Sequence, residues 1–205
     1  MKRYSVIYAD PPWKYGGKYS TGSVGKRNGA RSASSHYKVM SMEEIKSLPI
    51  SEIAEDDAAL FLWVTGPFLQ EGLDVIRAWG FTYKTIAFCW VKLEQDERVF
   101  FGIGSYTKSN SELCLLGTRG NIITKGNALD GLIVRSHKES QVITTSRRNK
   151  IAGPGNPFHS MKPDQAYEKI ERLFGDVSRI ELFARRKREG WNCWGNQVKS
   201  DVEIK

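Results

Sequence analysis

Cysteine and histidine are scarce in this chain of 205 residues, with three of each. Cys89, Cys114 and Cys193 lie far apart and form no C-x-x-C pair, and no histidine stands at metal-ligand spacing from another histidine or from a cysteine. The sequence therefore predicts no disulfide framework and no metal site. Two of the cysteines lie in apolar runs, which favours buried free thiols.

Long apolar runs are also absent. No stretch approaches the ~18 apolar residues of a membrane span, and the first residues, MKRYSVIYADPPW, contain no apolar core of a secretion signal. A hydrophobic content of 40% and a charged content of 26% are typical of a globular protein. We therefore expect one domain over residues 1–205, with its own core and a cytoplasmic location.

Acidic residues are nearly missing from three segments in which basic residues gather, 11–42, 135–150 and 185–188, although the net charge is only +8. Each segment alone could be a solvated loop. Three basic loops on a chain that is otherwise acidic suit a polyanion, so the distribution favours nucleic acid as the partner. The candidate contacts are Lys14, Tyr15, Lys18, Tyr19, Lys26, Arg27 and Arg31 in the first segment, Arg147, Arg148 and Lys150 in the second, and Arg186, Lys187 and Arg188 in the third.

The tetrapeptide Asp10-Pro11-Pro12-Trp13 directly follows the apolar run at 4–9. A β-rich run that ends in a carboxylate, two prolines and an aromatic ring predicts a strand that opens into a rigid polar pocket. Such a pocket suits an aromatic amine such as that of adenine. Asp10 and a proline carbonyl would accept its two N–H groups, and Trp13 would offer a ring for stacking. The alternative is a proline-rich turn with Trp13 in the core.

Apolar runs alternate with amphipathic segments along the rest of the chain. We expect further strands at 58–64, 81–92, 112–117, 141–145 and 179–184, and helices at 41–48, 67–79 and 162–174. In the second helix, the residues expected to face the core are Leu69, Leu73, Ile76 and Trp79. This alternation predicts an α/β fold with a mainly parallel sheet and helices on both faces. Ligands bind beyond the carboxyl ends of the strands in such sheets.

Several segments, in one order from Tyr4 to Gln197, resemble the N6-adenine methyltransferases related to the eukaryotic mRNA adenine methyltransferase, which also include bacterial and phage DNA methyltransferases. They are IYADPPW, LFLWVT, SELCLLGTRG, HSMKPDQAYEKIERL, and RIELFAR with a downstream WGNQ. The resemblance implies a Rossmann-like sheet, S-adenosylmethionine as methyl donor and adenine as acceptor. It also implies that the catalytic motif precedes the cofactor segment in the sequence.

Position by position, the resemblance assigns Asp10 and the carbonyls of Pro11 and Pro12 to the target amine, and Trp13 to the base pocket. Asn110 and Glu112 match the segment on the acceptor side, although a glutamate at the start of a strand could equally be structural. The donor-binding set would be Asp10, Lys162, Glu181, Arg185, Asn196 and Gln197, with Lys162 on the methionine carboxylate. Lys162 and Glu181 could instead be a solvated lysine and one half of an ion pair at the sheet edge.

We therefore expect an enzyme that methylates adenine N6 in nucleic acid, with DNA preferred because the chain lacks the extra RNA-binding regions of the mRNA enzymes. Those enzymes carry a His-Asn pair where this chain has Arg186, Lys187 and Arg188, so we expect phosphate contacts there. Residues 149–158 resemble an insertion. Three alternatives stay open: a catalytically silent nucleic-acid-binding subunit, an RNA adenine methyltransferase and a cytosine-N4 methyltransferase. A homodimer also stays open.

Overall fold

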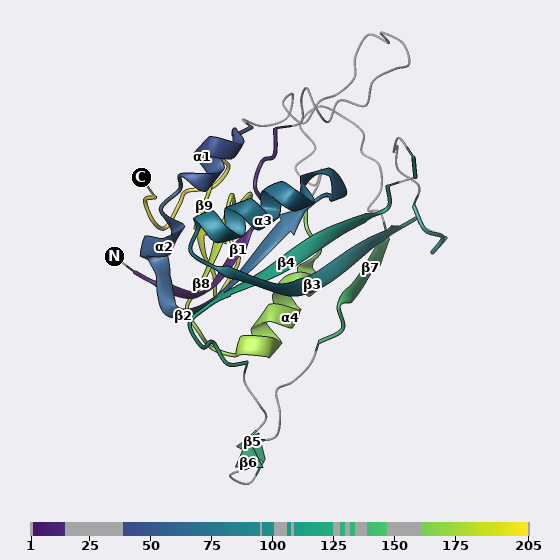
Figure 1. Cartoon of the computed structure of the whole chain (residues 1–205). Coiled ribbons are helices and arrows are strands. Elements are labelled where there is room, and N and C mark those ends of the chain that lie inside the picture. The colour runs from purple at the N-terminus through teal and green to yellow at the C-terminus, as the bar shows by residue number, and fades with distance from the viewer. Residues whose placement is uncertain are drawn as a thin grey trace.

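The computed structural model describes residues 2–14, 39–94, 96–100, 106–107, 109–124, 128–129, 132–133, 139–146 and 161–204. A seven-stranded sheet lies between helix α3 (Leu69–Ala78) on one face and helix α4 (Asp164–Phe174) on the other (Figure 1). Two short helices, α1 (Met42–Lys46) and α2 (Ile50–Ile53), precede β2 in the sequence. The expected α/β fold with helices on both faces is confirmed.

The strand order in the sheet is β7-β3-β4-β2-β1-β8-β9. The central strand β1 (Tyr4–Ala9) is parallel to β2 (Ala54–Val64) and to β8 (Arg179–Leu182), which in turn is parallel to β9 (Asn192–Trp194). Strand β3 (Thr82–Leu93) is parallel to the edge strand β7 (Val142–Ser146). Only β4 (Ser111–Arg119) among the described strands of this sheet is reversed, because it pairs antiparallel with both β2 and β3. A separate two-stranded ladder joins β5 (Ala128–Leu129) to β6 (Leu132–Ile133).

Both faces of the central strand are buried. Ile7 and Ala9 point into the core under α3, whereas Val6 and Tyr8 point into the core over α4, and all four are fully buried. A strand covered on both faces has few solvent-facing positions, so apart from the half-buried Ser5 its sequence is apolar instead of alternating. The prediction of a strand at 4–9 is therefore confirmed at both ends.

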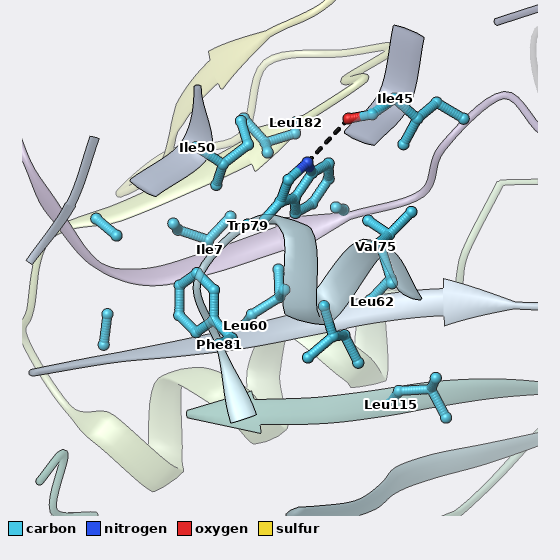
Figure 2. Packing of buried hydrophobic residues seen from close by; sticks show 14 of the residues in the cluster. Ile7, Ile45, Ile50, Leu60, Leu62, Val75, Trp79, Phe81, Leu115 and Leu182 are labelled. Atoms are coloured by element: carbon cyan, nitrogen blue, oxygen red, sulfur yellow. Dashed lines mark hydrogen bonds between the residues drawn. The ribbon is translucent and has the colours of Figure 1, made fainter. Parts of the chain in front are cut away.

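Trp79, at the C-terminal end of α3, connects this helix to α1. Its ring is fully buried, and its indole Nε1 donates a hydrogen bond of 2.9 Å to the carbonyl of Ile45 (Figure 2). The last carbonyls of a helix have no partner within the helix, and this bond satisfies one of them in α1. The N-terminal end of α1 carries the capping box of Ser41 and Glu44.

One expectation about α3 is wrong. Leu69 was expected to face the core, but it is 39% exposed. The chain forms a 3-10 turn (η3, Gly66–Phe68) before α3, and the buried stripe of the helix runs through Gly72, Val75 and Ile76. Leu69 is the first residue of α3, and the turn before it buries the preceding residue, Phe68, in the core instead.

The sequence pattern also missed the edge strand β9. The residues after β9 run back along it, where the Asp201 amide donates to the Cys193 carbonyl and the Asp201 carboxylate accepts from the Cys193 amide. All three cysteines are free; Cys114 and Cys193 are buried and Cys89 is half-buried. None of the helices in the described ranges has both the length and the apolar character that a membrane span requires.

Candidate active site

Asp10 stands at the carboxyl edge of the sheet, directly after β1. The preceding residue, Ala9, pairs with Leu62 of β2 and with Leu182 of β8, so Asp10 lies between the ends of two parallel neighbours. The carbonyls of Pro11 and Pro12 accept hydrogen bonds from the amides of Trp13 and Met40. A carbonyl oxygen has two lone pairs, so each can still accept a donor from a ligand, and the internal bonds hold both oxygens in place.

Trp13 is packed into this edge and not displayed on a loop. It is buried, its Nε1 donates to the carbonyl of Trp63 at 3.2 Å, and its ring stacks on Phe68 with centroids 5.5 Å apart. The bond to Trp63 ties the motif to the end of β2. Trp13 therefore packs in the hydrophobic core at this edge of the sheet, with one face of its ring covered by Phe68.

Asp10 and three other charged side chains, each from a different part of the chain, meet at this edge of the sheet. The ammonium of Lys162, which precedes α4, lies 2.8 Å from Asp10 Oδ2 and 2.9 Å from Glu112 Oε2. Glu112 belongs to β4, and its other oxygen accepts from Lys92 of β3. The Lys162 ammonium also lies 5.5 Å from the centre of the Trp63 ring. The structure thus links the expected catalytic carboxylate to the expected donor-binding lysine.

Burial and pairing act in opposite directions on these charges. Burial raises the pKa of Asp10, and the Lys162 ammonium partly offsets the increase. Burial also acts to raise the pKa of Glu112, but Lys162 and Lys92 together outweigh it and lower that pKa to about 2. Desolvation opposes the charge on Lys162, whereas the two carboxylates raise its pKa above the usual value. Glu112 and Lys162 are therefore both charged at neutral pH.

Glu181 is the second buried carboxyl group of the site and lies on β8. Burial raises its pKa to about 7, although a hydrogen bond from Tyr167 of α4 acts to lower it, and the charge of Asp10 adds to the increase. Tyr167 packs against Tyr8, with ring centroids 4.5 Å apart. An acid with this pKa changes charge near neutrality.

The remaining expected donor contacts follow β8 and β9. Arg185 lies close enough to Asp10 to lower its pKa, and Asn196 and Gln197 are exposed. Gly195 allows the two segments to meet, because a Cβ atom at this position would lie 2.4 Å from the Ala184 carbonyl oxygen. The expected donor-binding residues thus come from the carboxyl ends of β1, β8 and β9 and from the start of α4.

The basic residues expected to bind nucleic acid are described only in part. Lys14 is exposed and Asn110 is half-buried. Arg186 and Arg188 both pair with Asp164 at the start of α4, and Lys187 pairs with Asp201. These three side chains fasten their segment to neighbouring elements. The others lie outside the described residues: Tyr15, Lys18, Tyr19, Lys26, Arg27, Arg31, Arg147, Arg148 and Lys150.

Sequence reasoning missed Lys92 altogether. Its only sequence signal is a charged residue near the end of an otherwise apolar stretch of β3. Glu112 was expected on the acceptor side or in a structural role, and the structure places its carboxylate in the buried charge cluster. The contact between Glu112 and Lys92 could not be known without the pairing of β3 with β4.

Comparison with known proteins gives matches over nearly the whole chain. Residues 4–197 match the model of the MT-A70 family. The chain is 34% identical over 213 residues to the type II methyltransferase M.MunI from Mycoplasma sp, covering 99% of this chain and 82% of that protein. It is also 28% identical to the human N(6)-adenosine-methyltransferase catalytic subunit METTL3, with 97% of this chain and 29% of that protein covered. The Drosophila melanogaster MT-A70-like protein is likewise 28% identical, with 27% of its length covered. The chain therefore spans less than a third of these two eukaryotic relatives.

Proposed function

The chain belongs to the MT-A70 family, and on this premise we propose that it methylates the N6 amine of adenine in DNA. It is an S-adenosylmethionine-dependent adenine-N6 methyltransferase of nucleic acid. The preference for DNA is supported by M.MunI, a type II methyltransferase that matches this chain over most of both lengths. The N(6)-adenosine-methyltransferases match at lower identity and over less than a third of their length.

The observation that supports this function best is the position of Asp10, at the carboxyl edge between β2 and β8 and in contact with Lys162. The lone pair of an adenine amine is delocalised into the ring, which makes the nitrogen a poor nucleophile. Asp10 and a carbonyl of Pro11 or Pro12 would each accept one N–H, which orients the nitrogen and returns electron density to it. A base in duplex DNA must first leave the stack, which costs a few kcal/mol.

The residues at this edge fit the methyl donor. S-adenosylmethionine supplies an electrophilic methyl group on a sulfonium. The buried Glu181 carboxyl suits the two hydroxyls of a ribose, and the Lys162 ammonium suits a carboxylate. Exposed amides at Asn196 and Gln197 suit the edge of an adenine ring. These assignments place the donor beside Asp10, where the amine would meet it.

Two further features of the function are proposed from the composition of the chain. The basic segment 14–39 is our candidate for the phosphate contacts, together with 147–150. A single methyltransferase domain in the cytoplasm agrees with the composition of the chain.

Identification of the product tests the proposal directly. The protein is incubated with tritium-labelled S-adenosylmethionine and either amplified DNA of mixed sequence or an RNA transcript of the same sequence. The nucleic acid is then digested to nucleosides and separated. We expect label in N6-methyldeoxyadenosine. Label in N4-methyldeoxycytidine, or label in RNA alone, would contradict the proposal. Calorimetry with the donor excludes the silent subunit if binding is seen.

A further inference from the structure

The buried charges beside Asp10 form one continuous chain, Lys92–Glu112–Lys162–Asp10. Glu112 lies between two ammonium groups, with Oε1 on Lys92 and Oε2 on Lys162. Lys162 in turn lies between two carboxylates, at 2.8 Å from Asp10 and 2.9 Å from Glu112. Asp10 and Glu112 therefore share one ammonium at nearly equal distance.

Burial strengthens the interactions among these charges. The side chain of Lys162 is 6% exposed, that of Glu112 is 10% exposed and that of Asp10 is 20% exposed. Water screens such charges poorly, so each depends on its partners. Lys92, at 26% exposed, is the member closest to solvent. A stronger interaction between Glu112 and Lys162 therefore weakens the interaction between Lys162 and Asp10.

We propose that Glu112 is a positioning residue of the active site, which sets how strongly Lys162 holds and ionises Asp10, while Lys92 keeps Glu112 in place. This inference rests on the proposed function, in which Asp10 accepts the amine of the target base. It gives Glu112 a role within the protein and not in nucleic-acid binding. It also gives Lys162 a second role besides donor binding.

Several titratable groups among the described residues interact with Asp10. Lys162 and Arg185 favour its ionised form, and Glu112 disfavours it. The other titratable groups that interact with Asp10 are Tyr8 on β1, Cys114 on β4, Tyr167 on α4 and Glu181 on β8. Tyr8, Cys114 and Tyr167 stay neutral at ordinary pH because burial raises the pKa of each. Lys162 is the cation in direct contact.

The test uses two substitutions that must act in opposite directions. Lys162→Met removes the partner of Asp10, so its carboxyl should need a higher pH to ionise. Glu112→Gln removes the competitor, so Lys162 should hold Asp10 more strongly and the carboxyl should ionise at a lower pH. A charge in direct contact shifts a pKa by about 1–3 units, and we expect a shift of this size for Lys162→Met and a smaller, opposite one for Glu112→Gln.

Two measurements report these shifts. The first is the rate of methyl transfer to amplified DNA of mixed sequence in a single turnover with saturating donor, followed against pH. The acid limb of the rate profile should move to higher pH in Lys162→Met and to lower pH in Glu112→Gln. The second is a carbon-13 NMR titration of the Asp10 carboxyl in the protein without donor or DNA, with Asp10→Asn used to assign the signal.

Matched variants separate this role from others. Lys162→Arg keeps the charge and should restore much of the wild-type pH profile. Lys92→Met should move the acid limb of the rate profile to slightly higher pH, because Glu112 then interacts more strongly with Lys162. Arg77→Met removes an equivalent charge from an exposed pair on α3 and should leave the profile unchanged. Thermal melting shows whether each variant is folded.

Shifts in opposite directions support the inference. The inference would be overturned if both Lys162→Met and Glu112→Gln showed the wild-type pH profile of methyl transfer and the wild-type NMR titration of Asp10. It would also be overturned if weaker DNA binding were the only defect of Glu112→Gln. If Lys162→Met does not fold, the downward shift in Glu112→Gln still decides. If wild type labels neither DNA nor RNA, the proposed function is refuted, whereas the NMR titration still tests the inference.

Discussion

The affinity of the protein for its methyl donor should depend on pH through Glu181. This carboxyl is buried at the end of the sheet, and burial raises its pKa to about 7. A ribose diol donates two O–H groups, which an ionised carboxylate accepts best. The protonated acid carries a donor of its own where an acceptor is needed. Donor binding should therefore favour ionised Glu181 and weaken as the pH falls below about 7.

The magnitude follows from the pKa. An acid with a pKa of about 7 is about nine-tenths ionised at pH 8 and about one-tenth ionised at pH 6. If only the ionised form binds, donor affinity should fall about tenfold between pH 8 and pH 6, or about 1.4 kcal/mol. At pH 7 the free protein is half protonated at Glu181, so binding should release about half a proton.

Calorimetry with S-adenosylhomocysteine measures both effects and avoids turnover. Titrations at pH 6, 7 and 8 give the affinity, and repeating the pH 7 titration in buffers of different ionisation enthalpy gives the proton release. Glu181→Gln serves as the control, because an amide does not titrate. Its affinity should be lower at pH 8 and nearly independent of pH. Asp10, Arg186 and Arg188 also act on Glu181, and they are retained in this control.

A steep pH dependence that persists in Glu181→Gln would refute the reasoning, because another group would then be responsible. Equal affinities of wild type at pH 6 and pH 8 would refute it as well.

The pH dependence of folding stability through Glu181 has the opposite sign to that of donor binding. The folded state raises this pKa above its unfolded value, so the contribution of Glu181 to stability is complete at acid pH and is lost as the pH rises through about 7.

Three further outcomes are expected. Asp10→Ala should slow methyl transfer by about two decades or more with the fold intact, and Asp10→Asn should keep a trace of activity because an amide oxygen still accepts one N–H; circular dichroism and the labelling assay check this. Trp79→Phe should destabilise the protein by about 0.5–1.5 kcal/mol, measured by urea unfolding, since the Ile45 carbonyl loses its indole donor and keeps the longer bond from the Leu48 amide; an unchanged midpoint would contradict this. Replacing three basic residues together should flatten the plot of log affinity for a short duplex against log salt by two or more units, at about 0.9 per phosphate contact. An unaltered slope would move the DNA surface elsewhere; the three are Lys26, Arg27 and Arg31.

Sequence alone was enough for features that depend on local preferences. The run Tyr4–Ala9 is short, β-rich and apolar at nearly every position, which is typical of a strand buried on both faces, and Asp10 follows at its end. The start of α1 is equally local, because Ser41 and Glu44 cap each other over three residues. The resemblance across residues 4–197 supplied the donor and acceptor, and the family match confirmed it.

Tertiary structure alone decided which side chains meet. The reversal of β4 places Glu112 between Lys92 and Lys162, and no local pattern encodes strand direction or register. The same holds for Arg186, whose charge suggested phosphate but which pairs with Asp164. The sequence specifies which side chains can carry a charge. The partners and the burial of such a side chain depend on residues distant in the chain that packing brings together, and its pKa depends on both.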